Sequence, residues 1–153
     1  MFPRSKLVPE LIVTDLQRSL AFWVSDLGFQ VAYRRPEEGF AYLDLGGAQI
    51  MLEQVNLQDQ WITGRLEAPL GRGINFQIDV GEVAPVIERL NRRGWPLFQA
   101  CEDAWYRAGA VEVGQRQFLV QDPDGYLLRL AERLGERPLP PTALPSDAVT
   151  APA

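Results

Sequence analysis

The chain contains no histidine among its 153 residues. Histidine supplies most general acid–base chemistry near neutral pH and is a common ligand of zinc and non-haem iron. Its absence excludes histidine-based catalytic triads, His-ligated metal sites and imidazole proton shuttles. Carboxylates, amides, arginines and aromatic rings remain, and this set suits a binding protein better than a hydrolase or an oxygenase.

Cysteine and long apolar runs are also scarce. The single cysteine, Cys101, cannot form an intrachain disulfide or a thiolate metal site. Glu102 and Asp103 follow it, and because their charges raise the pKa of a thiol, a catalytic thiolate is not expected. No stretch approaches the roughly 18 apolar residues that span a bilayer, and the first residues lack the apolar run of a signal peptide. We therefore expect a cytoplasmic protein that does not enter a membrane.

Basic residues are outnumbered. There are 15 Lys and Arg residues against 20 Asp and Glu residues, which gives a net charge of −5. This sign argues against sequence-independent nucleic-acid binding, which needs a basic surface. An acidic surface near a site favours a cationic ligand. The alternative is that the charge serves solubility alone.

The hydropathy pattern predicts the order β-α-β-β-β twice. Thr14 and Gln17 have the spacing of a capping box at the start of the first helix, and Gly28 lies where a left-handed cap is expected. The predicted elements of the first unit are strands over 7–13, 29–34, 40–45 and 48–54, with a helix over 14–27. Those of the second are strands over 73–79, 96–100, 114–121 and 126–131, with a helix over 82–93.

These elements predict one α+β domain over residues 1–134. Module one covers about 7–54 and module two 72–132. Between them lies a linker over 55–71, read as a loop or short helix around Trp61. Residues 135–153 are rich in proline and small residues. We expect no regular element there, but a flexible tail or one draped on a neighbour.

Three segments resemble a known superfamily, the vicinal oxygen chelate (glyoxalase/bleomycin resistance/dioxygenase) superfamily. They are Leu11–Trp23, Leu27–Phe29 and Gln117–Leu130, and the turn Asp122-Pro123-Asp124-Gly125 is the most specific piece. The resemblance implies that tandem β-α-β-β-β modules form a curved mixed sheet shaped as a cup. In the enzymes of this superfamily the cup holds a divalent metal.

The metal positions that the resemblance implies are mostly occupied by other residue types. The first-strand positions fall on Val8 and Gly73, and the last-strand position of module two falls on Arg129. The remaining position lies within Met51–Glu53, where only Glu53 could be a ligand. We therefore expect neither a metal nor another cofactor.

The best match is to the metal-free bleomycin-resistance proteins, which are acidic cytoplasmic dimers that sequester drugs. The hairpin around Gly114–Phe118 carries this match. The resemblance implies a homodimer whose ligand grooves, lined by aromatic residues and carboxylates, are shared between two subunits. Val113 replaces a tryptophan often found beside this hairpin, and Trp105-Tyr106-Arg107 could take over its role.

If Val8, Gly73 and Arg129 face the cup, as the resemblance implies, alternation along the strands predicts which other side chains line it. Polar groups there either bind a ligand or form an internal network in which Arg129 pairs with Glu53 or Glu10. The expected cup residues are Glu10, Glu53, Asn75, Gln77 and Arg129. The residues expected to pack behind are Leu11, Val13, Ile74, Phe76, Ile78, Leu128 and Leu130.

Three aromatic residues lie in predicted loops. Trp61, Trp105 and Tyr106 either stack on a flat or cationic ligand or serve loop packing or a dimer contact. Arg107 either binds an anionic group or is simply solvated.

The sequence thus favours a non-catalytic binding protein that sequesters a small molecule, such as an antibiotic, at a dimer interface. An alternative is a lyase or dioxygenase-like enzyme of the same fold that acts without the usual metal site. A third hypothesis is a relic of the fold with a structural or regulatory role.

Overall fold

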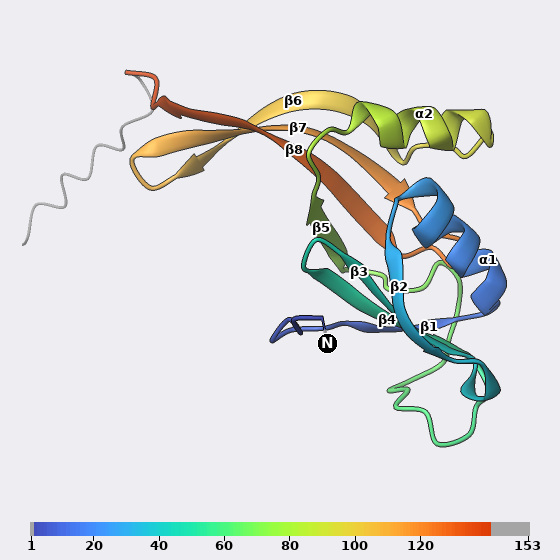
Figure 1. Ribbon diagram of the computed structural model, residues 1–153. Helices are drawn as coiled ribbons and strands as arrows, with labels where there is room; N and C mark the ends of the chain where they lie inside the picture. Colours follow the sequence, from blue (N-terminus) through green and yellow to red (C-terminus); the bar gives the residue numbers. More distant parts are fainter. Residues whose placement is uncertain (1, 142–153) are drawn as a thin grey trace, which may run out of the picture.

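Two four-stranded sheets carry the fold in the computed structural model, which describes residues 2–141 (Figure 1). Sheet A has the order β1-β4-β3-β2 and sheet B the order β5-β8-β7-β6. In each sheet the first strand runs parallel to the last, and the other pairs are antiparallel. The tandem β-α-β-β-β prediction is therefore confirmed. The strands are β1 Glu10–Val13, β2 Gln30–Arg35, β3 Phe40–Leu45, β4 Ala48–Gln54, β5 Asn75–Asp79, β6 Gln99–Ala108, β7 Val111–Gln121 and β8 Leu127–Pro138.

The first helix does not begin with the predicted capping box. The side chain of Asp15 accepts the Arg18 N–H at 3.0 Å and caps the helix, whereas the Thr14 hydroxyl donates to Asp124 Oδ1 at 2.6 Å. Thr14 is thus engaged by the second module. The helices are α1 Leu16–Leu20, which continues as the π-helical η1 Ala21–Asp26, the 3₁₀ turn η2 Pro36–Glu38, and α2 Ala84–Arg92.

Both helices lie on the same side of the molecule, where the two modules meet (Figure 1). The rings of Phe22 and Trp95 are 5.1 Å apart, and Arg93 forms an ion pair with the buried Asp26. One hydrophobic core runs through both modules and includes the fully buried Trp23. The face of each sheet turned away from this core, which we call its cup face, carries none of the helices of residues 2–141 (Figure 1).

The Asp-Pro-Asp-Gly turn joins the modules. Asp122 is 3% exposed and accepts hydrogen bonds from Trp23 Nε1 at 3.2 Å and from the backbone N–H of Tyr126 at 2.9 Å. The Tyr126 hydroxyl donates to the carbonyl of Ile12 in β1 at 2.9 Å. Burial raises the pKa of Asp122 to about 6, because a charged carboxylate is poorly solvated there. The most specific sequence motif is therefore an inter-module contact.

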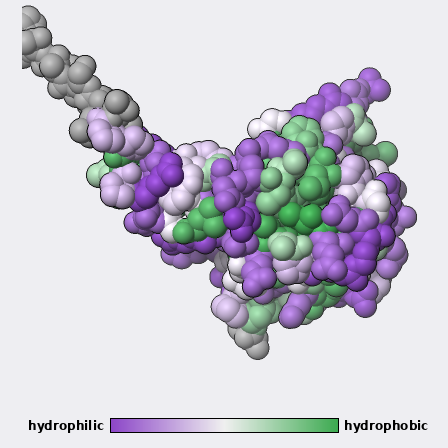
Figure 2. Space-filling view, turned by 90° about the horizontal axis from the view of Figure 1, so that it is seen from above, coloured by the Kyte–Doolittle hydropathy of each residue, from purple (hydrophilic) through white to green (hydrophobic). Residues whose placement is uncertain are grey.

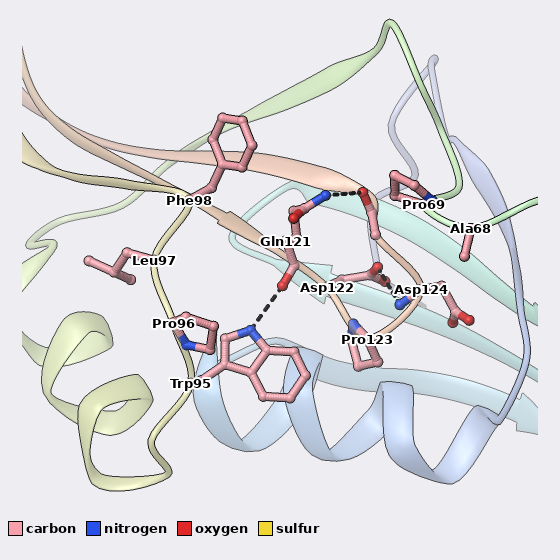
Figure 3. A pocket seen from close by; sticks show the side chains of 11 residues that line it. Ala68, Pro69, Trp95, Pro96, Leu97, Phe98, Gln121, Asp122, Pro123 and Asp124 are labelled. Atoms are coloured by element: carbon pink, nitrogen blue, oxygen red, sulfur yellow. Dashed lines mark hydrogen bonds between the residues drawn. The ribbon is translucent and has the colours of Figure 1, made fainter.

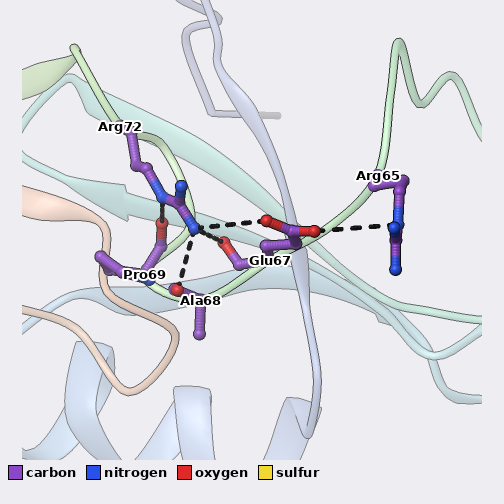
Figure 4. A network of polar contacts seen from close by, with 5 residues as sticks. All are labelled: Arg65, Glu67, Ala68, Pro69 and Arg72. Carbon is purple, nitrogen blue, oxygen red and sulfur yellow. Dashed lines mark hydrogen bonds and ion pairs between the residues drawn. The ribbon is translucent and has the colours of Figure 1, made fainter.

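The linker contains no helix, and its last part is held against the same turn. Arg72 donates to the carbonyl groups of Glu67 and Ala68, at 3.1 and 3.0 Å, and to that of Pro69 at 3.1 Å (Figure 4). The Leu70 N–H donates to the Asp124 carbonyl at 2.8 Å. One arginine thus fixes the path of the chain between the modules.

Strands β6, β7 and β8 extend beyond the body as a three-stranded arm (Figures 1 and 2). The short strand predicted over 96–100 is wrong, because β6 covers Gln99–Ala108 and pairs with β7 up to Ala108 opposite Val111. Strand β8 also continues past Gly135, where no regular element was predicted, because its backbone pairs with β7 as far as Pro138. The rest of the predicted tail, residues 142–153, lies outside the described part.

Hydrophobic side chains gather on the upper face of the body, with hydrophilic ones around them (Figure 2). Within residues 2–141, no helix has both the length and the apolar character required to cross a membrane.

Candidate functional site

The strand register defines the cup face of sheet A. Glu10 in β1 lies opposite Met51 in β4, which lies opposite Tyr42 in β3. Ile12, Glu53 and Phe40 form the next row in the same way. Residues directly opposite one another share a face. The intervening Leu11 and Val13 are buried in the core, so the predicted alternation along β1 is confirmed.

A pocket of about 270 Å³ opens on this face between β1, β4 and the linker. It brings together three residues predicted from the sequence, namely Glu10, Glu53 and Trp61, while Ile12, Asp59 and Gln60 complete its lining. Gln60 Nε2 donates to Glu53 Oε1 and to the Gln54 carbonyl, both at 2.9 Å, and so anchors the loop beside Trp61. The Trp61 residue is 93% exposed, which leaves its indole ring available for stacking.

The electrostatics of the pocket favour a cation. The pKa of Glu10 is raised, first by desolvation and then by repulsion from the neighbouring Glu53 carboxylate, while Arg35 acts in the opposite direction. A cationic ligand placed between the two carboxylates relieves this repulsion. Proton uptake by Glu10 competes with such a ligand, so its affinity should fall on acidification, at a higher pH than for an ordinary glutamate.

The cup face of sheet B carries the other polar residues predicted for the cup. Arg129 in β8 lies opposite the exposed Gln77 in β5, and Asn75, also exposed, precedes them along the strand. Gln117, which is 3% exposed, donates through Nε2 to the Tyr106 hydroxyl, and the Arg129 guanidinium lies 6.0 Å from the Tyr106 ring. These five side chains form an amide-rich surface with one cation.

The internal pairing of Arg129 is not found. Within residues 2–141, Arg129 forms no ion pair, and its buried Nε has no hydrogen-bond partner. The packing predicted behind Arg129 is confirmed for Leu128 and Leu130, which are fully buried. Ile74 is an exception, because it precedes the first residue of β5 and is 48% exposed rather than packed behind the sheet.

Trp105, Tyr106 and Arg107 lie on strand β6, not in a loop as predicted. Neighbours along a strand point to opposite faces, so Trp105 faces away from Tyr106. Its ring lies against Gly114, with the Arg137 guanidinium 4.1 Å from the ring centre. Arg107 donates to the Gly109 carbonyl at the tip of the arm. The structure does not bring Trp105 or Arg107 to the other candidate residues.

A more voluminous cavity lies elsewhere, between the Asp-Pro-Asp-Gly turn, the linker and the segment after α2 (Figure 3). Its volume is about 750 Å³. Trp95 Nε1 donates to the Gln121 carbonyl at 2.9 Å, and Gln121 Nε2 donates to the Gly125 carbonyl at 3.2 Å. These polar groups are satisfied within the fold, and none of the predicted site residues lines the cavity, so we place the candidate site on sheet A.

The register also settles how the two modules correspond at the implied metal positions. Glu53 lies opposite Ile12, and Arg129 lies opposite Gln77. Ile12 lies four residues after the first-strand position Val8, and Gln77 lies four residues after the first-strand position Gly73. Glu53 is therefore the counterpart of Arg129. Across residues 2–141, no three His, Cys, Asp or Glu side chains are placed to hold a metal ion. The residues present do not fit a divalent metal.

Elemental analysis of the purified protein should therefore find no stoichiometric zinc, nickel, iron or manganese. The physical reason is that Val8 and Gly73 offer no side-chain donor and that a guanidinium stands at position 129. About one tightly held metal per chain would contradict this expectation and revive the metalloenzyme alternative.

Comparison with known proteins identifies the family. The model of the Glyoxalase/Bleomycin resistance protein/Dioxygenase superfamily matches residues 7–130. The chain is similar to TioX from Micromonospora sp. ML1, with 25% identity, a TM-score of 0.65 and coverage of 85% of this chain and 99% of that one. It is also similar to a superfamily member from Alicyclobacillus acidocaldarius, with 21% identity, a TM-score of 0.56 and coverage of 84% and 90%. A superfamily member from Vibrio splendidus 12B01 is 41% identical over 80% of this chain and 94% of that one, with a TM-score of 0.36. Comparison with curated proteins gives no match. The chain belongs to the glyoxalase/bleomycin resistance/dioxygenase superfamily.

Proposed function

We propose that this protein is a non-catalytic small-molecule binding protein of the bleomycin-resistance kind, which sequesters a planar or cationic ligand on the cup face of sheet A. The convergence of Glu10, Glu53 and Trp61 in one pocket is the observation that carries the proposal. Paired carboxylates beside an exposed aromatic ring suit a flat cation. The net charge of −5 adds a long-range attraction for the same kind of ligand.

A second copy of the chain completes the groove in this proposal. The cup face of sheet B carries Arg129 without an ion-pair partner in the described residues, and sheet A carries the neighbouring acids Glu10 and Glu53. Arg129 and the pair of Glu10 and Glu53 are complementary in charge, so pairing them between copies satisfies both. Light scattering at micromolar concentration should report a homodimer. A monomer would remove the shared groove and leave only the sheet A pocket.

Titration with bleomycin and with proflavine, a planar aromatic cation, tests the function. Trp61 fluorescence should be quenched, and Trp61→Phe should abolish most of the quenching. Trp61→Ala should weaken binding by an amount on the order of 1–3 kcal/mol, taking base–aromatic stacking as a guide. Trp105→Phe is the matched control, because Trp105 lies on the arm against Gly114 and should leave both signals unchanged. No heat and no quenching with either compound at millimolar concentration would refute the proposal.

Glu53→Gln separates the charge of the pocket from its shape. Removing the carboxylate should weaken proflavine binding and reduce its dependence on salt, because part of the attraction is between opposite charges. Glu37→Gln, which removes an exposed acid outside the pocket, is the control. Equal effects of the two substitutions would show that only the overall charge matters.

A further inference from the structure

A cluster of aromatic side chains lies on the cup face of sheet A, outside the core. The rings of Tyr33 and Tyr42 stack at 5.1 Å with planes 20° apart, and Phe40 lies 5.9 Å from Tyr33. The Arg35 guanidinium covers Phe40 at 3.7 Å. Phe40 and Tyr42 are only 2% and 3% exposed, yet neither belongs to the core cluster behind the sheet. Something on the cup face must therefore cover them. We call Tyr33, Phe40 and Tyr42 the aromatic shelf.

The segment Phe2–Ser5, which we call the strap, covers the two tyrosines of the shelf, while Arg35 covers Phe40. The Phe2 ring lies 5.4 Å from Tyr42 and 6.3 Å from Tyr33, and the Arg4 guanidinium lies 6.0 Å from both tyrosine rings. An aromatic ring and a cation therefore rest on the shelf side by side. Stacking and cation–π attraction, the two forces that hold them, also hold flat cationic ligands.

The strap is attached mainly through one side chain, Gln49. Gln49 Oε1 accepts the Ser5 N–H at 2.8 Å, and Gln49 Nε2 donates to the Pro3 carbonyl at 2.7 Å. The Ser5 hydroxyl adds a bond to the Gly47 carbonyl at 2.7 Å. The strap belongs to no sheet, so its release would break no strand pairing. Few bonds and no ladder make it one of the segments that open most easily.

We propose that the aromatic shelf is a stacking subsite for a planar aromatic ring that carries a positive charge, and that the strap occupies this subsite in the unliganded protein. Phe2 stands where the ring of a ligand would lie, and Arg4 shows that the shelf holds a positive charge beside that ring. The shelf adjoins the pocket of the proposed function, because Phe40 is the cross-strand neighbour of Glu53 and Tyr42 is in the row of Glu10. The inference rests on that function and adds to it a ligand class and an internal competitor.

Proflavine titration of Phe2→Ala tests the subsite. Removal of the competing ring should tighten binding roughly two- to tenfold, the equivalent of one aromatic pair. The matched control is Phe98→Ala, which removes a phenylalanine that is 60% exposed and lines the cavity beside Trp95 instead. This variant should keep the wild-type dissociation constant. Thermal unfolding of each variant shows whether the substitution also changes stability.

Hydrogen exchange of the Ser5 amide gives a readout that a purely structural strap would not move. In the free protein this amide is bonded to Gln49, and saturating proflavine should make it exchange faster. Unchanged or weaker proflavine binding by Phe2→Ala, or unchanged exchange at Ser5, would overturn the strap proposal. The proposed function would stand if Glu53→Gln still weakened binding. Absence of proflavine binding to wild type and to Phe2→Ala alike would end the subsite proposal, and the proposed function would end with it only if bleomycin also failed to bind.

Discussion

Replacing Gly125 with alanine is expected to lower the free energy of unfolding by roughly 3 kcal/mol or more. Gly125 has φ of +99°, a conformation that L-residues rarely adopt. An added Cβ would lie 2.4 Å from the Pro69 Cβ and 2.6 Å from its Cα. Pro69 cannot move aside easily, because Arg72 holds its carbonyl and those of the two residues before it. Urea unfolding of the variant and of wild type measures the loss.

Gly47→Ala separates the two causes of this loss. Gly47 has nearly the same φ, +100°, but an added Cβ would meet nothing within 4 Å. Gly47→Ala should lower the free energy of unfolding only by the backbone strain, about 1–2 kcal/mol. The excess for Gly125→Ala then measures the collision between the Asp-Pro-Asp-Gly turn and the linker. Equal losses would show that the turn and the linker do not press on each other, contrary to the inter-module contact described above.

The stability of the protein should contain a component that falls between about pH 4 and pH 7 because of Asp122. Its folded-state pKa is about 6, against an ordinary value of 3.8. The folded state therefore binds this proton more tightly than the unfolded chain. The stabilisation is fully present below the ordinary pKa and is lost as the pH rises through the folded-state value. At about 1.4 kcal/mol per unit of pKa, the shift amounts to roughly 3 kcal/mol.

Asp122→Asn isolates this component, because the amide keeps the shape of the side chain but does not titrate. Urea unfolding of both proteins from pH 4 to pH 7 gives the difference in stability, in which the other carboxyl groups cancel. Wild type should lose roughly 3 kcal/mol relative to the variant over this range. A constant difference would mean that the hydrogen bonds from Trp23 and the backbone outweigh desolvation and keep Asp122 ionised.

Local pattern predicted much of the fold but not the length of the arm. The strands of the body have one buried face, so their apolar residues alternate as in Leu11 and Val13. In the arm, both faces of β6 are largely open, and Glu102–Arg107 shows no such alternation. Thr14 shows the same limit for caps, since its hydroxyl binds Asp124 in the other module rather than its own helix. Tertiary contacts decide both cases.

Some residues of the candidate site could be predicted from the sequence, and others could not. Glu10 could be placed on the cup face by alternation from Val8, Glu53 from the position that the resemblance implies within Met51–Glu53, and Trp61 from its position in a polar loop. The sequence does not mark Gln60 as a pocket residue, because its hydrogen bond to Glu53 depends on the path of the loop that brings it back to β4. The strap was also hidden, because Phe2 meets Tyr33 and Tyr42 only after β2 and β3 have paired. In the sequence Trp105 and Trp61 are equivalent candidates, and only the register of β6 separates them.

A crystal structure of the protein grown with proflavine tests the location of the site most directly. We predict that the ring system lies over Tyr33 and Tyr42 in place of Phe2, with its positive charge toward Glu53 and one edge near Trp61. Proflavine bound instead in the cavity beside Trp95 and Phe98, with the strap still on the aromatic shelf, would contradict both the site and the ligand class proposed for it.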